Sequence, residues 1–312
     1  MTQTEKQKMM LTAPVEGLIC RMAVPTIISM LVTALYNMAD TYFVGKLGSN
    51  AATGAVGVAL PLMAIIQATG FFFGHGSGNS ISRHLGAGDV EDAETLAVCG
   101  FAGAIGAGLI ICVLGQLLLE PLSLLLGSTA TILPYAKEYM RYILFAAPYM
   151  TAALVHNNQL RLQGNANFAM IGITSGAVLN VALDPLFIFT FDMGVAGAAA
   201  ATALSQLVSF VILLWALRRA GCVPLRFRYV RCMPSVMGQI FGGGLPSLVR
   251  QGLGSHSVMM LNRAAGPYGD AAIAAMSIVG RISQFAGSAV IGFGQGFQPV
   301  CGFNYGAGKR ER

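Results

Sequence analysis

Long apolar segments, separated by short polar or glycine-rich stretches, fill most of this sequence. A helix needs about 20 mainly apolar residues to cross the hydrocarbon core of a bilayer. Eight segments meet that requirement, near residues 18–44, 52–82, 93–119, 132–162, 167–190, 195–217, 244–264 and 271–302. The pattern therefore predicts an all-α polytopic membrane protein with about eight transmembrane helices.

The composition supports a membrane environment. Of the 312 residues, 55% are hydrophobic and only 10% are charged, whereas a soluble domain carries roughly 25% charged residues. A chain with so few charges could not cover a surface that faces water, so the lipid bilayer is its expected surroundings. The net charge of +6 is then interpreted through the position of the basic residues, and we expect no nucleic-acid partner.

The basic residues gather on one side of the membrane if the eight helices alternate in direction. That side receives Lys6, Lys8, Arg21, Arg83, Arg161, Arg218, Arg219, Arg226, Arg228, Arg231, Lys309, Arg310 and Arg312, and the other side receives Lys46, Lys137 and Arg263. Because cytoplasmic loops collect Lys and Arg, we expect the N-terminus to lie in the cytoplasm. The protein itself is expected in the plasma membrane. The first residues show no cleavable signal and are expected to be a soluble lead-in.

Two glycine-rich stretches indicate an internal repeat. Residues 72–88 read FFGHGSGNSISRHLGAG and residues 292–308 read GFGQGFQPVCGFNYGAG, with six identities at an offset of 220. That offset holds six predicted helices, so the copies would be parallel. We expect an N-terminal lobe (1–219), a basic cytoplasmic linker (220–243) and an incomplete second lobe (244–312) that lacks roughly four helices. Chance similarity between glycine-rich helices is the alternative.

The sequence resembles the multidrug and toxic compound extrusion (MATE) family. The resemblance is carried by VPTIISMLVTALYNMADTYFVGKLG (24–48), GHGSGNSISRHLGAG (74–88), LNVALDPLFIF (179–189) and the stretch 292–308 quoted above. It implies two six-helix lobes, twelve helices in all, and export of small-molecule drugs or toxins. This sequence is shorter than the family's usual length, so an inactive fragment of a transporter is one alternative interpretation.

Two acids lie within apolar segments, Asp40 and Asp184. An ionisable group at that depth costs about 2.5 kcal/mol or more, which makes it a functional candidate. Asn180 lies one helical turn before Asp184, and Pro185 deprives the carbonyl of Val181 of its usual partner. An amide, a free carbonyl and two carboxylates would form a hard-oxygen site that suits Na⁺ or a proton.

Further residues support the same site. Asn37 and Thr41 bracket Asp40 at helical spacing. The resemblance implies that the family's cation site corresponds to Asp40, Asp184, Asn180 and Thr202, and we expect cation loading to bend the first helix at Pro25.

Other polar residues are given structural interpretations. His75 and His256 are expected to serve packing more than proton relay. The polar end of the fourth segment, HNNQLRLQG (156–164), is interpreted as a helix end that reaches the cytoplasm. The sequence contains no HExxH or GxSxG motif, so we expect neither an enzyme nor a cofactor other than the coupling ion.

The preferred hypothesis is antiport of amphipathic, often cationic organic molecules against Na⁺ or H⁺. A flippase for lipids or lipid-linked oligosaccharides is the alternative, and it would need a basic cavity. The basic residues lie mainly in the expected cytoplasmic loops, with Arg250 and Arg281 as the exceptions. The oligomeric state and the substrates are left open, because a pliable apolar cavity has no sequence code.

Overall fold

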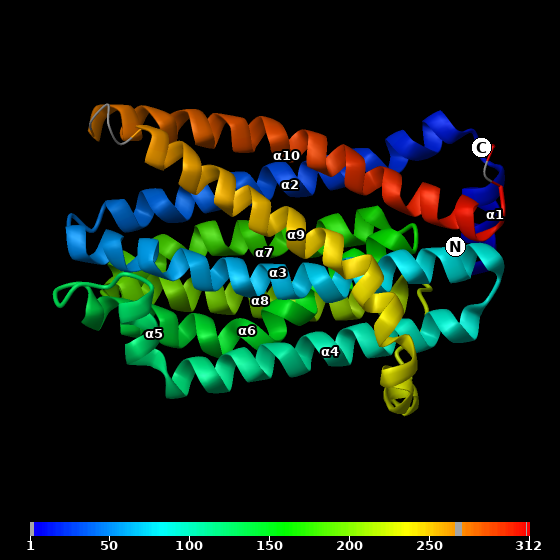
Figure 1. Cartoon of the computed structure of the whole chain (residues 1–312), viewed down its shortest axis with the longest axis horizontal. Helices are drawn as coiled ribbons and strands as arrows, with labels where there is room; N and C mark the ends of the chain where they lie inside the picture. Colours follow the sequence, from blue (N-terminus) through cyan, green and yellow to red (C-terminus); the bar gives the residue numbers. More distant parts are fainter. Residues whose placement is uncertain (1–2, 266–269, 310) are drawn as a thin grey trace.

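The computed structural model describes residues 3–265, 270–309 and 311–312, and this part of the chain is folded almost entirely into helices (Figure 1). The elements are α1 (Gln3–Thr12), α2 (Val15–Gly45), α3 (Asn50–Ala87), α4 (Val90–Leu117), α5 (Leu119–Leu125), α6 (Leu133–Leu162), α7 (Ala166–Pro185), the π-helix η1 (Leu186–Thr190), α8 (Gly194–Arg219), the 3-10 helix η2 (Phe227–Cys232), α9 (Met233–Ala265) and α10 (Asp270–Gly306).

The long helices correspond to the eight predicted segments. Among the residues that the structure describes, five stretches, in α2, α3, α4, α7 with η1, and α8, are long and apolar enough to cross a membrane. The first turns of α6 carry Lys137, Glu138 and Arg141, which lowers the apolar character of that helix. The prediction of an all-α polytopic membrane protein is confirmed.

The elements α1 and α5 were not expected from the hydrophobic pattern. Helix α1 is polar along most of its length, and α5 is a single short helix. Helix α9 begins at Met233, inside the segment 220–243 that we expected to be a linker, so the irregular chain after α8 is short. The division into two lobes stays a prediction.

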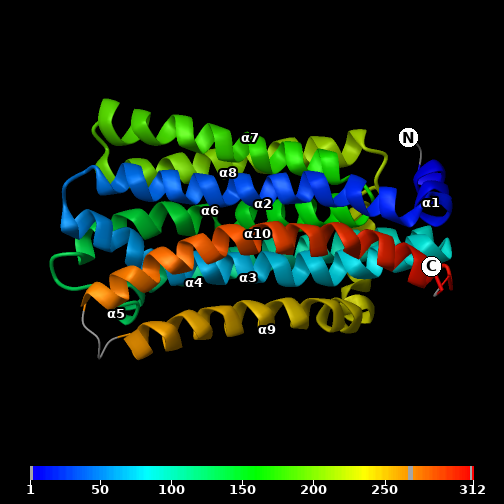
Figure 2. The same ribbon diagram turned by 90° about the horizontal axis from the view of Figure 1, so that it is seen from above.

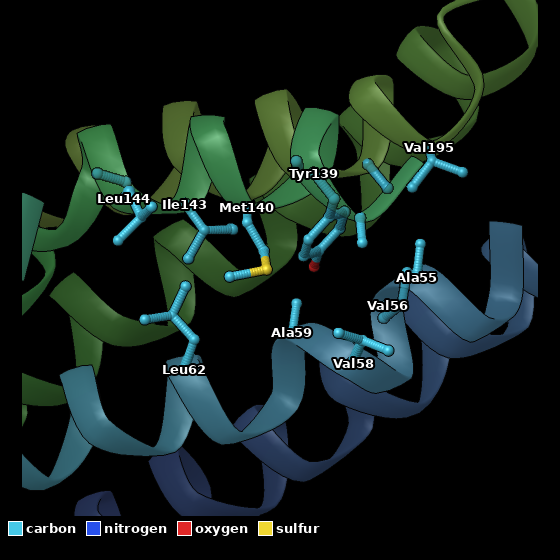
Figure 3. Packing of buried hydrophobic residues seen from close by; sticks show 14 of the residues in the cluster. Ala55, Val56, Val58, Ala59, Leu62, Tyr139, Met140, Ile143, Leu144 and Val195 are labelled. Atoms are coloured by element: carbon cyan, nitrogen blue, oxygen red, sulfur yellow. The ribbon is translucent and has the colours of Figure 1, made fainter. Parts of the chain in front are cut away.

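Helix α6 lies at the centre of the bundle and packs against α3, α4, α7 and α8. Alanines on α3 let larger side chains of α6 approach closely, and Figure 3 shows Ala59 and Leu62 facing Met140 and Ile143. Helix α2 packs against both α7 and α10, while α9 lies along α3 on the outer side of the bundle (Figure 2). Helices α2 and α3 therefore form most of the contact of the first six long helices with the last two.

Both termini, α1 and η2 lie at one end of the bundle, which we call the basic end (Figure 1). Lys309 donates to the carbonyl of Leu11 at 3.1 Å, which ties the C-terminal residues to α1. Arg226, in the segment that leads into η2, pairs with Glu94 at 3.5 Å. The assignment of this end to the cytoplasm stays a prediction.

The close packing of α2 and α3 against α9 and α10 is concentrated toward the basic end. A Cβ at Gly244 would meet the carbonyl of Phe72, and one at Gly292 would lie 2.7 Å from the Cα of Ile27. Nearer the opposite end, a Cβ added to any of Gly252, Gly254, Gly280 and Gly287 would meet nothing within 4 Å. The tightest glycine contacts between the two groups of helices thus lie toward the basic end.

Candidate functional site

Asp184 lies where α7 changes its helical geometry. The side chain is 0% exposed, and α7 ends at the next residue, Pro185, before continuing as the π-helix η1. Proline has no N–H to give to the carbonyl of Val181, and the N–H of Leu186 donates to the carbonyl of Leu183, three residues back. Short π-helical segments are rare in proteins, and those that occur are frequently at functional sites.

Asn180 links Asp184 to the neighbouring helix. Its Nδ2 donates to Oδ1 of Asp184 at 3.3 Å and to Oγ1 of Thr202 on α8 at 3.4 Å. All three side chains are buried. Within the described residues, Oδ1 of Asn180 and Oδ2 of Asp184 are buried and have no hydrogen-bond partner. The cluster therefore presents buried acceptor oxygens that no donor of the described residues satisfies.

Asp40 approaches this cluster from α2. Its Oδ1 atom is also buried and lacks a partner among the described residues. The carboxyl groups of Asp40 and Asp184 lie close enough to interact electrostatically. Two carboxylates within electrostatic range of each other repel, and a proton or another cation bound near them relieves this repulsion. Asn180, Asp184 and Thr202 thus form one hydrogen-bonded cluster of α7 and α8, and Asp40 on α2 lies within electrostatic range of Asp184.

Two tyrosines near these acids were not anticipated from the sequence. Tyr36 and Tyr139 both interact electrostatically with Asp40 and Asp184. Tyr36 lies one helical turn before Asp40, so its spacing could have revealed it. Tyr139 comes from α6 and is fully buried, and nothing in the local sequence connects it with either acid.

The other predicted supporting residues lie elsewhere. Asn37 and Thr41 are exposed, and the Thr41 hydroxyl donates to the Asn37 carbonyl at 2.9 Å. They line a small hollow between α2 and α10 together with Gln284 and Phe285. Pro25 is buried within α2, which continues as one helix from Val15 to Gly45. Their roles in binding or bending stay predictions.

The expectation for Arg161 was wrong. It was interpreted as a charge at a helix end that reaches water, yet its side chain is only 2% exposed and lies among polar groups of α3, α6 and α10. His75 belongs to the same group, whereas His256 is exposed. The side chain of Arg281 lies outside the described residues.

The oxygens around Asp184 fit a hard cation. Carboxylate, amide and hydroxyl oxygens are typical ligands of such ions, and the three unpartnered buried oxygens named above show that the protein itself leaves this capacity unused. Asp40, Asn180, Asp184 and Thr202 would hold the ion. A proton on one carboxyl group would satisfy the same arrangement by donating to a neighbouring oxygen.

Comparisons with known proteins agree on one family. The family model described as MatE matches residues 25–186 and 246–312. The multidrug export protein MepA of Staphylococcus saprophyticus is 30% identical over 284 residues, which are 91% of this chain and 63% of that protein. The chain therefore spans less than two thirds of that relative's length.

Solved structures show the same relationship. A MATE protein crystallised in complex with MaD3S has a TM-score of 0.92 at 30% identity, over 97% of this chain and 69% of its own. A MOP superfamily transporter from Pyrococcus furiosus, described as having a binding pocket of reversed polarity that suggests a different function, has a TM-score of 0.89 at 30% identity, over 97% and 68%.

Proposed function

Because the chain belongs to the MATE family, we propose that it exports amphipathic, often cationic organic molecules across the cell membrane in exchange for Na⁺ or H⁺. The observation that carries this proposal is the cluster of unpartnered buried oxygens at Asn180 and Asp184, beside Asp40. A site of this kind costs stability unless it serves a cation.

Helix α2 offers a route from the cation site to the rest of the protein. Asp40 lies on α2, which packs against α7 on one side and α10 on the other. Placing a cation between Asp40 and Asp184 removes their repulsion and draws α2 toward α7. The same movement changes the contact between α2 and α10, and with it the space open to an organic molecule. Inward movement of one positive charge supplies about 2.3 kcal/mol per 100 mV.

The hollow between α2 and α10 has the mixed chemistry that amphipathic molecules require. Ala34, Met38 and Phe285 supply apolar surface, and Gln284 with Asn37 supplies amide groups. Methionine and aromatic side chains adapt to ligands of different shape. We propose that transported molecules contact this hollow from the end opposite the basic end, with the basic end in the cytoplasm.

The test is ethidium efflux from cells that produce the chain, with Asp184→Asn against Asp192→Asn. Asp192 is an exposed aspartate eight residues further along, with a positive φ of 51° that asparagine also tolerates. We expect Asp184→Asn to lower the efflux rate at least tenfold and Asp192→Asn to leave it unchanged. Equal efflux by the two variants would contradict the role of the acidic site.

The alternative of a lipid flippase makes a different demand on charge. Arg250 lines an exposed apolar hollow on α9 with Leu245 and Val249, and its guanidinium would contact the phosphate group of a lipid in that hollow. Binding of a fluorescent organic cation, measured against binding of a lipid pyrophosphate, separates the two functions. Tighter binding of the pyrophosphate, weakened by Arg250→Gln, would favour the flippase. If cells that produce the chain show no efflux, while cells that produce a longer relative do, the result would favour an inactive fragment.

A further inference from the structure

Arg161 carries a positive charge that is buried inside the bundle. It is the second-last residue of α6, yet its side chain is 2% exposed. None of the ion pairs found among the described residues involves it. A buried charge without an opposite charge is strongly unfavourable unless oriented dipoles stabilise it. The groups that surround Arg161 therefore define its role.

Those groups are neutral and come from two parts of the molecule. On its own helix, Asn158 accepts from Nη2 of Arg161 at 2.6 Å. On α10, Gln295 accepts from Nη1, and Gln298 accepts from Nη2 at 3.4 Å. Gln295 is itself only 6% exposed. The charge on α6 is thus stabilised by carbonyl dipoles that α10 supplies.

His75 extends the network to α9. Its Nε2 lies 3.1 Å from Nη2 of Arg161, and its Nδ1 lies 2.9 Å from the hydroxyl of Ser247. Because a guanidinium can only donate, Nε2 must accept, and the proton of the neutral ring is on Nδ1. A hydrogen-bonded chain therefore runs from α6 through α3 to α9.

The network follows the internal repeat. His75 and Gln295 are 220 residues apart, which is the offset of the repeat, and both bind Arg161. The next residue in each copy is a glycine at a tight helix contact. A Cβ at Gly76 would meet the carbonyl of Ile240, and one at Gly296 would meet the backbone of Ala23. Arg161 thus lies between two equivalent contacts that join the first six long helices to α9 and α10.

We propose that Arg161 locks the basic end of the bundle shut. Its bonds to Gln295 and Gln298, and through His75 to Ser247, hold α10 and α9 against the first six long helices. These bonds break before the chain opens at the basic end, a step that rests on the proposed transport function. Arg161 is a positioning residue in this scheme, because it acts through the helices that it holds.

The distance between the two groups of helices at the basic end tests the lock directly. Spin labels would be placed on the native, exposed Cys301 of α10 and on Asp92→Cys at the exposed start of α4, with the other five cysteines replaced by alanine. Pulsed electron paramagnetic resonance in nanodiscs then reports the distance distribution. We expect Arg161→Met to raise the population of long distances roughly tenfold, as the loss of about 1.4 kcal/mol would produce.

Two variants separate the lock from a general loss of structure. Arg219→Met removes an arginine at the same end that is exposed and stacks on Trp215, and it should leave the distances unchanged. Exchanging the partners, as Arg161→Gln with Gln295→Arg, should restore the short distance. Unchanged distances in a folded Arg161→Met chain would overturn the proposal, as would an equal shift in Arg219→Met.

The conservative change keeps the test informative if Arg161→Met does not fold. Gln295→Leu leaves Arg161 bonded to Asn158 and His75 and should still lengthen the distance, and no change in that variant would also overturn the lock. Ethidium efflux by the unaltered chain judges the proposed function separately. Absence of efflux together with a lengthened distance in Arg161→Met would remove the transport proposal and leave the lock in place.

Discussion

Gly86 and Gly306 make reciprocal contacts with each other's helices. A Cβ at Gly86 would meet the carbonyl of Phe303, and a Cβ at Gly306 would meet the carbonyl of Arg83. The two glycines are 220 residues apart, and so are Arg83 and Phe303. The matching positions of the repeat therefore face each other across the contact between α3 and α10, as a two-fold axis between the copies requires.

This contact predicts the effect of a single methyl group. Gly306→Ala should lower the stability of the chain by about 1–3 kcal/mol, because the Cβ meets backbone that no side-chain rotation can remove. Gly280→Ala, on the same helix, adds its Cβ to open space and should be neutral or slightly stabilising. Thermal unfolding in detergent measures both. Equal melting temperatures would show that α3 and α10 are less tightly packed than the structure indicates.

How much of the site could be predicted depends on the signal that each residue leaves in the sequence. Asp184 and Asn180 could be selected as candidates from the sequence, because a carboxylate, an amide one turn earlier and a following proline stand out in an apolar segment. Tyr139 left no such signal, because its relation to the two acids is set by the packing of α6.

Arg161 did leave a signal in the sequence, but that signal led to a wrong prediction. Charge near the end of an apolar segment normally indicates the membrane surface, and the sequence gives no sign that α3 and α10 extend past the end of α6 and enclose it. Only the helix packing shows that the polar end of α6 faces Gln295 and His75. The fold class and helix positions followed from hydrophobicity, whereas the partners of buried polar groups required the tertiary structure.

The coupling ion can be identified from stability. The Na⁺ concentration would be raised at constant ionic strength, with Na⁺ taking the place of choline. The melting temperature should rise if Na⁺ binds at Asp184. Saturation at 100 times the dissociation constant corresponds to about 2.7 kcal/mol. If a proton is the ion, the melting temperature should depend on pH and be insensitive to Na⁺. Asp184→Asn should abolish either response while Asp192→Asn retains it, and a response that persists in Asp184→Asn would place the ion elsewhere.

Thr202→Val tests the hydroxyl that receives a bond from Asn180. Valine has nearly the same shape, so the change removes one acceptor and leaves the amide of Asn180 less constrained. The affinity for the coupling ion should fall roughly two- to twelvefold, as loss of one hydrogen bond of about 0.5–1.5 kcal/mol implies. Thr69→Val is the matched control, because within the described part of the chain its hydroxyl donates to the carbonyl of Ile65 on its own helix and to no other helix. The ion titration above measures both variants, and an equal effect in Thr69→Val would count against a role for Thr202.

Cys222 provides a pH-dependent probe of the basic end, outside the membrane-spanning segments. Burial raises the pKa of its thiol from 9.0 to about 11, although Lys6 and a hydrogen bond from Asn165 at 3.1 Å act in the opposite direction. The folded chain therefore keeps this proton between pH 9 and 11, where the unfolded chain releases it. The stability that Cys222 contributes is complete below pH 9 and is lost as the pH rises toward 11.

The same pKa predicts the reactivity of this cysteine. A thiolate is the reactive form, and at pH 8 a thiol with a pKa of about 11 is ionised to about one part in a thousand. Maleimide should therefore label the exposed Cys232 at pH 8 well before it labels Cys222, and the labelling of Cys222 should accelerate as the pH approaches 11. Lys6→Met removes the cation that favours the thiolate, so it should slow this labelling further if α1 stays in place. Mass spectrometry of the two cysteine peptides measures the labelling. Faster labelling in Lys6→Met would show instead that Lys6 holds α1 over Cys222 through the carbonyls of Ala220 and Gly221.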